Sequence, residues 1–110
     1  MEASAYGYFA DLAGELPDLP ADSILSRTLY EGEDAKVILF GFAPGQALSE
    51  HTAARPAILH FLSGEARLVL GADTLEAGPG TWVRMPPRLT HAIHARTQVV
   101  MLLVLLGPGD

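Results

Sequence analysis

Residues Pro44–Gly64 read PGQALSEHTAARPAILHFLSG, and this stretch decides the fold. It opens with a Pro-Gly turn, carries a single histidine, His51, in a short polar segment, and continues as the apolar run Ala57–Leu62. Ser63-Gly64 comes next, where glycine readily adopts the positive φ that a tight turn needs. Turns that closely bracket a short apolar run are typical of antiparallel β-strands.

A second module of the same kind follows at Gly80–His91, which reads GTWVRMPPRLTH. A short strand is expected at Thr81–Met85, and Pro86-Pro87 then gives a stiff, extended exit. His91 begins the next short strand. Each module therefore offers one imidazole, and we expect the two imidazoles to face a shared pocket.

Turn-forming residues divide the rest of the chain at similar intervals. The 110 residues include 11 glycines and 8 prolines that are spread along the sequence, as in an all-β sandwich or barrel. No strand–helix alternation is visible, so a two-sheet antiparallel fold is the simplest interpretation. In all, strands are expected at 24–30, 35–43, 57–62, 65–70, 74–76, 81–85, 91–95 and 99–106.

The chain is expected to divide into an N-terminal arm (residues 1–23), one β-barrel domain (24–106) and a short tail (107–110). Apolar residues in the arm recur at roughly helical spacing, which predicts one or two helical turns before Pro17. A partly ordered arm is the alternative. The residues with this spacing are Tyr6, Phe9, Leu12 and Leu16.

Charge and composition exclude several classes of protein. The formal net charge is −6 and the seven Lys and Arg residues are scattered, whereas nucleic-acid binding needs a clustered basic surface. Cysteine is absent, which excludes disulfides and thiolate sites and fits a reducing compartment. The longest apolar run, 99–106, is far shorter than the roughly 20 residues of a membrane helix. We expect a cytoplasmic protein with no nucleic-acid or membrane partner.

The two modules resemble the two sequence motifs of the cupin superfamily. The resemblance covers about residues 35–106 and points to a small single-domain cupin of the RmlC-like type. It implies an all-β double-stranded β-helix, or jelly-roll barrel, with a short N-terminal helical turn. The second motif departs at Arg88, where glycine is usual, and at Ala95, where asparagine is usual. The matching positions are Pro44-Gly45, His51 and Gly64 in the first motif, and Gly80, Pro86 and His91 in the second.

The resemblance also implies a metal site, of which this chain keeps half. Cupins with an intact site hold a divalent metal with two histidines one residue apart, a third ligand on the next strand, and a last histidine in the second motif. His51 and His91 match the first and last of these ligands, but the other two positions are Ala53 and Ala57. Two imidazoles hold Zn²⁺, Ni²⁺, Fe²⁺, Mn²⁺ or Cu²⁺ only when water or an exogenous ligand completes the shell.

The other histidines are not expected to repair this site, because side chains on a strand alternate between its faces. In the cupin frame Ala57, Leu59 and Phe61 point into the barrel, so His60 points outward. His94 likewise points away from the pocket. The outward face around His60 is apolar, and small cupins commonly pair their sheets through such a face. Together these two points predict a homodimer.

Two functions remain open, beside a purely structural dimer. The first is a cupin that binds a small organic molecule at a degenerate two-histidine site, without strong metal binding, in a pocket that is mostly apolar. The alternative is a metal-dependent enzyme, such as a dioxygenase or an isomerase/lyase, whose substrate completes the metal shell. No catalytic residue can be assigned in either case. The expected pocket residues are Ala53, Ala57, Leu59, Phe61, Met85, Ile93 and Arg55, the last as a candidate partner for a carboxylate.

Overall fold

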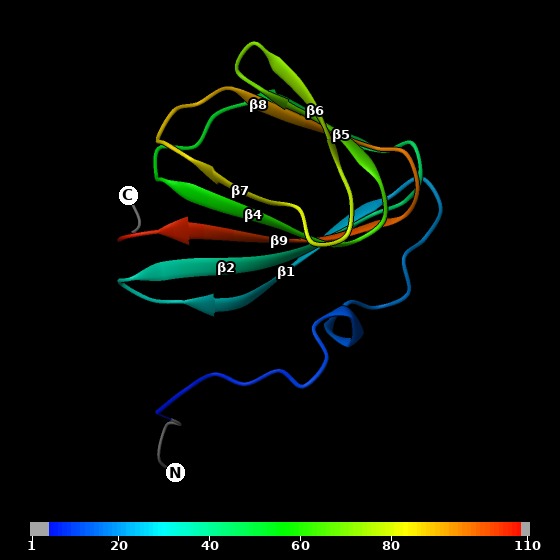
Figure 1. The fold of residues 1–110 in the computed structure, drawn as a ribbon. Coiled ribbons are helices and arrows are strands. Elements are labelled where there is room, and N and C mark those ends of the chain that lie inside the picture. Colours follow the sequence, from blue (N-terminus) through cyan, green and yellow to red (C-terminus); the bar gives the residue numbers. More distant parts are fainter. Residues whose placement is uncertain (1–4, 109–110) are drawn as a thin grey trace.

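The computed structural model describes residues 5–108, and nearly all of its regular structure is β (Figure 1). Residues 1–4 of the expected arm and 109–110 of the expected tail lie outside this range. A single turn of 3-10 helix at Ala13–Glu15 precedes the strands. The strands are β1 (Ile24–Glu31), β2 (Ala35–Phe42), β3 (Ala47–His51), β4 (Ala57–Ser63), β5 (Ala66–Leu70), β6 (Asp73–Ala77), β7 (Trp82–Met85), β8 (His91–Ala95) and β9 (Val99–Leu106).

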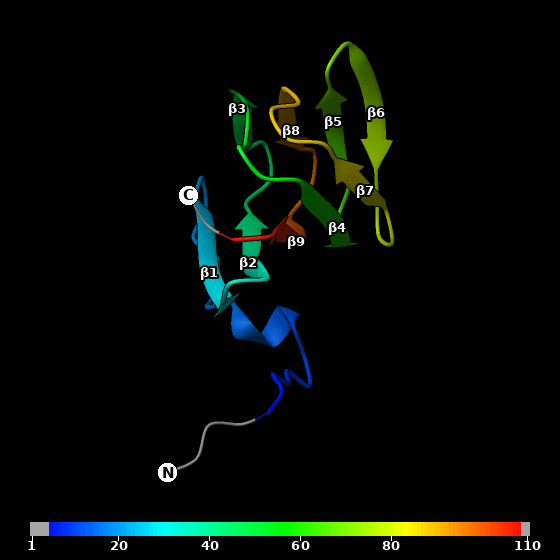
Figure 2. The ribbon, with the colours of Figure 1, turned by 90° about the vertical axis from the view of Figure 1, so that its left-hand side faces the viewer.

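The strands form two antiparallel sheets that pack face to face (Figures 1 and 2). One sheet has the order β1-β2-β9-β4-β7, and the other has the order β3-β8-β5-β6. The chain crosses between the sheets after β2, β3, β4, β6, β7 and β8, so the strands of the two sheets are interleaved along the sequence. The expected two-sheet jelly-roll barrel is confirmed.

The strand expectations hold except at β3, which the sequence did not indicate. Its five residues are mostly polar or small, and only Leu48 is partly buried and packs against the core. Hydrophobic alternation is the main sequence signal for a strand, and a polar strand at the edge of a sheet does not carry it.

The core lies between the two sheets. Alternate apolar side chains of each sheet point inward and meet there, as the alternation of a β-strand requires. Ala57, Leu59 and Phe61 are buried while their neighbours are only partly so, which confirms the expected orientation of β4. The largest fully buried side chains of this core are Phe42, Phe61, Leu59, Leu68, Met85, Ile93, Met101 and Val99, whereas Leu39 is buried on the outer face, opposite Leu102.

The N-terminal arm packs on the outer face of the five-stranded sheet, over β2. A Cβ placed on Gly41 would lie 3.0 Å from Leu16 Cδ1, so glycine at this position lets the arm approach the strand closely. Arg27 holds the arm from β1, because its Nη1 lies 3.2 Å from a carboxylate oxygen of Glu15 and donates to the Glu15 carbonyl. The expected helical turn is confirmed as one 3-10 turn, with Leu12 and Leu16 as its caps, but Tyr6 and Phe9 lie before it.

The outer face of the same sheet carries His60. It lies opposite Trp82 on β7 and Leu102 on β9, so it shares the outward face with them. The homodimer that this apolar face suggested stays a prediction. Within residues 5–108, no helix has both the length and the apolar character to cross a bilayer.

Candidate functional site

A β-bulge brings the two motif histidines together. The ladder between β3 and β8 shifts by one residue between Leu48 and His51, so Ser49 and Glu50 share one position opposite β8. In an unshifted ladder Glu50 would lie opposite His91, and His51 would point to the other face. The bulge therefore places His51 directly opposite His91 on the face that looks between the sheets.

The two imidazole rings are in contact. Their centroids are 4.1 Å apart and their planes are tilted by 58°. His91 is only 5% exposed, whereas His51 is exposed at the mouth of the barrel. The rings thus lie together, as expected from the motif positions, and their role as metal ligands stays a prediction.

Backbone carbonyls determine the tautomer of both rings. His51 Nδ1 lies 2.7 Å from the carbonyl oxygen of Ser49, and His91 Nδ1 lies 2.9 Å from that of Leu89. A carbonyl oxygen only accepts, so each Nδ1 must carry the hydrogen and donate it. In the neutral rings each Nε2 is then an acceptor with a lone pair. The site offers two such nitrogen acceptors side by side.

The environment of His91 favours its neutral form. Burial lowers the pKa of the His91 imidazole below its ordinary value of 6.5; the hydrogen bond to the Leu89 carbonyl opposes this, and the charge of a protonated His51 adds to it. A charge on His51 therefore disfavours a second charge on the neighbouring His91 ring.

This pKa shift predicts a pH dependence of stability. The unfolded chain takes up the His91 proton at a higher pH than the folded chain does, so the stabilisation is present above about pH 6.5 and is lost as the pH falls below it. We expect the free energy of unfolding, measured by urea denaturation between pH 8 and 5, to decrease toward pH 5. His91→Gln should flatten this part of the profile. An unchanged slope in His91→Gln would assign the dependence to other groups.

The donor set does not fit a metal held by this chain alone. The remaining two family ligand positions are methyl groups, at Ala53 and Ala57. Within residues 5–108, no three His, Cys, Asp or Glu side chains come close enough to share a metal ion. Catalytic zinc sites keep three protein ligands, and His51 and His91 supply two.

The apolar side chains expected to line a pocket belong to the packed core. A side chain that lines a water-filled cavity keeps accessible surface, yet these keep almost none. The side chains beneath the histidines are therefore closely packed, whereas the ring of His51 is exposed. Pocket lining by these residues stays a prediction. Their exposed fractions are 1% for Ala57, 1% for Leu59, 0% for Phe61, 2% for Met85 and 2% for Ile93.

Arg55 is engaged in holding the end of β9. Its Nε donates to the Leu106 carbonyl at 3.3 Å, and its Nη2 donates to the Gly107 carbonyl. The side chain is partly buried in this position. Part of its donor capacity is thus used by the backbone, and its expected role toward a carboxylate stays a prediction.

The loops of the two motifs are joined at the barrel mouth. The Arg88 N–H donates to the Ala53 carbonyl at 2.7 Å, which links the loop after β7 to the loop before β4. Arg88 has φ of 65°, a left-handed conformation that is uncommon for a residue with a side chain. This conformation explains why glycine is usual at the position, and Ala53, partly buried, lies at the same rim.

Comparisons with known proteins agree with the fold. A family model described as "Cupin domain" matches residues 38–106. A conserved protein of unknown function from Streptococcus pyogenes is 29% identical, with a TM-score of 0.84 over 99% of this chain and 100% of that one. A cupin superfamily protein from Desulfitobacterium hafniense is 24% identical, with a TM-score of 0.77 over 82% and 83% of the two chains.

A third structure, KdgF from Halomonas sp., is 18% identical, with a TM-score of 0.76 over 96% of each chain. Identities this low establish the fold and not the activity. No curated protein sequence matches the chain significantly. The family model spans more than half of the chain, so the protein belongs to the Cupin_2 family of cupin domains.

Proposed function

We propose that this cupin binds a small organic molecule at the mouth of its barrel, and that it holds no metal tightly by itself. The observation that carries the proposal is the contact between His51 and His91, with ring centroids 4.1 Å apart and both Nδ1 atoms committed to backbone carbonyls. The two Nε2 acceptors then form the polar part of the site.

The chemistry of the site selects a ligand with hydrogen-bond donors. A neutral Nε2 accepts from a hydroxyl or an N–H group, and the burial that lowers the pKa of His91 keeps this ring neutral near pH 7. The apolar core lies directly below the pair. A compact molecule with an O–H or N–H group and an apolar portion satisfies both features.

A metal-dependent enzyme is the second candidate, and one feature favours it. Histidines that bind metals commonly donate their other ring N–H to a backbone carbonyl, as His51 and His91 do here. This alternative requires that water or substrate oxygens supply the ligands that Ala53 and Ala57 do not.

The proposal predicts that each histidine contributes to ligand affinity. A library of small hydroxylated and amide compounds, screened against the untagged protein by ligand-observed NMR, should give binders that compete with one another. His51→Ala and His91→Ala should each weaken such a binder about ten-fold, which corresponds to one hydrogen bond of about 1.4 kcal/mol. His60→Ala is the matched control, because His60 lies on the outer face, and it should leave the affinity unchanged.

The same proteins distinguish the alternative. Elemental analysis should find far less than one metal ion per chain in protein purified without a histidine tag. Stoichiometric metal that is lost in His51→Ala and His91→Ala but kept in His60→Ala would support the enzyme instead. Turnover of a bound compound would also contradict a purely binding role.

A further inference from the structure

A row of polar side chains crosses the outer face of the four-stranded sheet. His94 of β8 lies opposite Ala47 of β3 on one side and Arg67 of β5 on the other, and Arg67 lies opposite Glu76 of β6. Residues directly opposite in antiparallel strands point to the same face. This face is the exposed one, since His94, Arg67 and Glu76 are all exposed. The row therefore lies on the far side of the sheet from His51.

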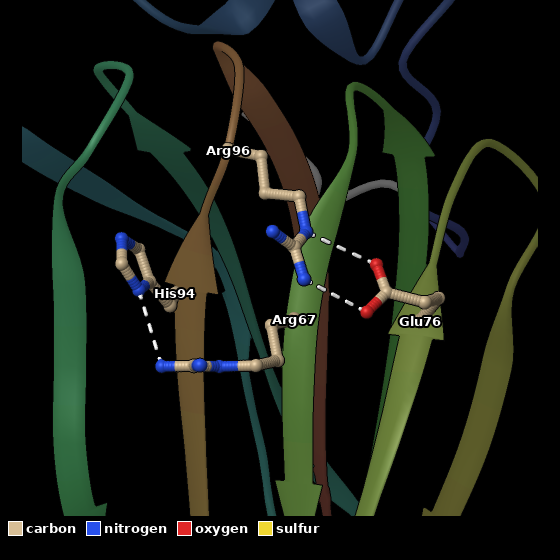
Figure 3. A network of polar contacts seen from close by, with 4 residues as sticks. All are labelled: Arg67, Glu76, His94 and Arg96. Carbon is tan, nitrogen blue, oxygen red and sulfur yellow. Dashed lines mark hydrogen bonds and ion pairs between the residues drawn. The ribbon is translucent and has the colours of Figure 1, made fainter.

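The two arginines of this face have different partners (Figure 3). Arg96 forms a bidentate pair with Glu76, with Nε to Oε1 at 3.0 Å and Nη2 to Oε2 at 2.9 Å. The bond with Arg96 lowers the pKa of the Glu76 carboxyl, so this carboxylate stays charged and committed to Arg96. Of the ion pairs formed within residues 5–108, none includes Arg67.

Arg67 contacts a histidine ring instead of a carboxylate. Its Nη2 lies 3.4 Å from His94 Nδ1 (Figure 3). A guanidinium has no acceptor, so Nδ1 must accept the hydrogen bond and the hydrogen of the neutral His94 ring is on Nε2. Arg67 therefore has N–H donors left over. Its charge is compensated only weakly, since Arg67 makes the smallest of the contributions to the lowered pKa of Glu76 and forms no ion pair within residues 5–108.

These donors line a hollow in the same face. The hollow has a volume of about 190 Å³ and lies between β3, β8 and β5. Arg67, His94 and Ser49 form its polar part, and small apolar side chains such as Val69 and Ala92 form its floor. The bulge of β3 at Ser49 is part of its wall.

We propose that this hollow is a second binding site, for a small monocarboxylate with a compact apolar body. The guanidinium of Arg67 takes the carboxylate in a charge-assisted pair, Ser49 and His94 offer further donors, and the body covers Val69 and Ala92. One negative charge matches the single charge of Arg67, which forms no ion pair within residues 5–108. A dianion such as phosphate is disfavoured, because the single charge of Arg67 leaves its second negative charge uncompensated.

The test is an NMR titration of the full, ¹⁵N-labelled chain with sodium isobutyrate. We expect saturable shifts of the Arg67 Nε–H and of the Ala92 and His94 amides, with a millimolar Kd, as suits a ligand of this size. The neutral isostere isobutyramide should bind at least ten-fold more weakly. Arg67→Ala should weaken isobutyrate at least ten-fold. Arg67→Lys, which keeps the charge but loses the planar fork, should weaken it about three-fold.

Three further variants make the test specific. Arg84→Ala, which removes an exposed arginine from the other sheet, should leave the Kd within two-fold. His91→Ala should also leave it unchanged, so failure of this site and failure of the barrel-mouth site are distinguishable. Arg96→Ala should weaken binding several-fold, because it frees Glu76 to pair with Arg67.

Several results would overturn the proposal. The first is a set of NMR shifts with isobutyramide that equal those with isobutyrate. The second is inorganic phosphate displacing isobutyrate at a lower concentration than that of isobutyrate. The third is an Arg67→Ala variant with a native spectrum and an unchanged Kd for isobutyrate. An Arg84→Ala variant as impaired as Arg67→Ala would show general electrostatic attraction and no site.

Discussion

Gly64→Ala is expected to lower the free energy of unfolding by about 4 kcal/mol, the sum of a backbone and a steric cost of about 1–3 kcal/mol each. Gly64 has φ of 87°, where a residue with a Cβ is strained. The added Cβ would overlap the carbonyl oxygen of Gln98 and lie 2.8 Å from Val99 Cα. Both obstacles are backbone atoms, so no change of rotamer can relieve the overlap.

The position matters because this turn joins the two sheets. It connects β4 of one sheet to β5 of the other, and its next residue, Glu65, is bonded to the connection between β8 and β9. The Arg96 N–H donates to the Glu65 carbonyl at 2.8 Å, and the Glu65 N–H donates to Thr97 Oγ1 at 3.0 Å. A turn pushed away from Gln98 would lose these bonds as well.

Two other glycines provide matched controls for Gly64. Gly45 and Gly80 have similar φ values, 84° and 90°, but a Cβ at either would meet no atom within 4 Å. Gly45→Ala and Gly80→Ala should therefore show the backbone cost alone, about 1–2 kcal/mol. Chemical denaturation measures all three variants on one scale. Equal losses at Gly64 and Gly45 would mean that the contact with Gln98 does not restrict the turn.

The sequence predicted a strand correctly where the residues of that strand form a recognisable hydrophobic pattern by themselves. The apolar run and the turn at Gly64 predicted a strand at 57–62, which the structure extends to Ser63, and the cupin resemblance predicted the face that its side chains take. The polar edge strand Ala47–His51 was missed, because it buries too little to impose a pattern. Its bulge was invisible for a further reason, since a bulge is a property of two paired strands and not of one.

The candidate sites likewise combine features that could be predicted from the sequence with features that could not. The proximity of His51 and His91 followed from motif positions, but the filled interior beneath them depends on how side chains of both sheets fit together. The cluster of Arg67, His94 and Glu76 could not be foreseen at all. These residues are brought together by the register of three strands, β8, β5 and β6, and no local pattern specifies that register.

Phe61→Ala tests whether the barrel interior is a core or a pocket. Phe61 is 0% exposed and belongs to the cluster that joins the two sheets. Removing a buried phenyl ring from such a core costs about 3–5 kcal/mol, through lost burial and the cavity that remains. We expect a loss in this range by urea denaturation.

A matched comparison makes the result decisive for the location of the ligand. Leu75, on β6, is 46% exposed, so Leu75→Ala should cost about 1 kcal/mol or less. If Phe61→Ala were as mild as Leu75→Ala, the ring would line open space, and a ligand could enter below the histidines. The large loss that we expect instead restricts any ligand to the rim, where His51 is exposed and His91 supplies the buried acceptor beside it.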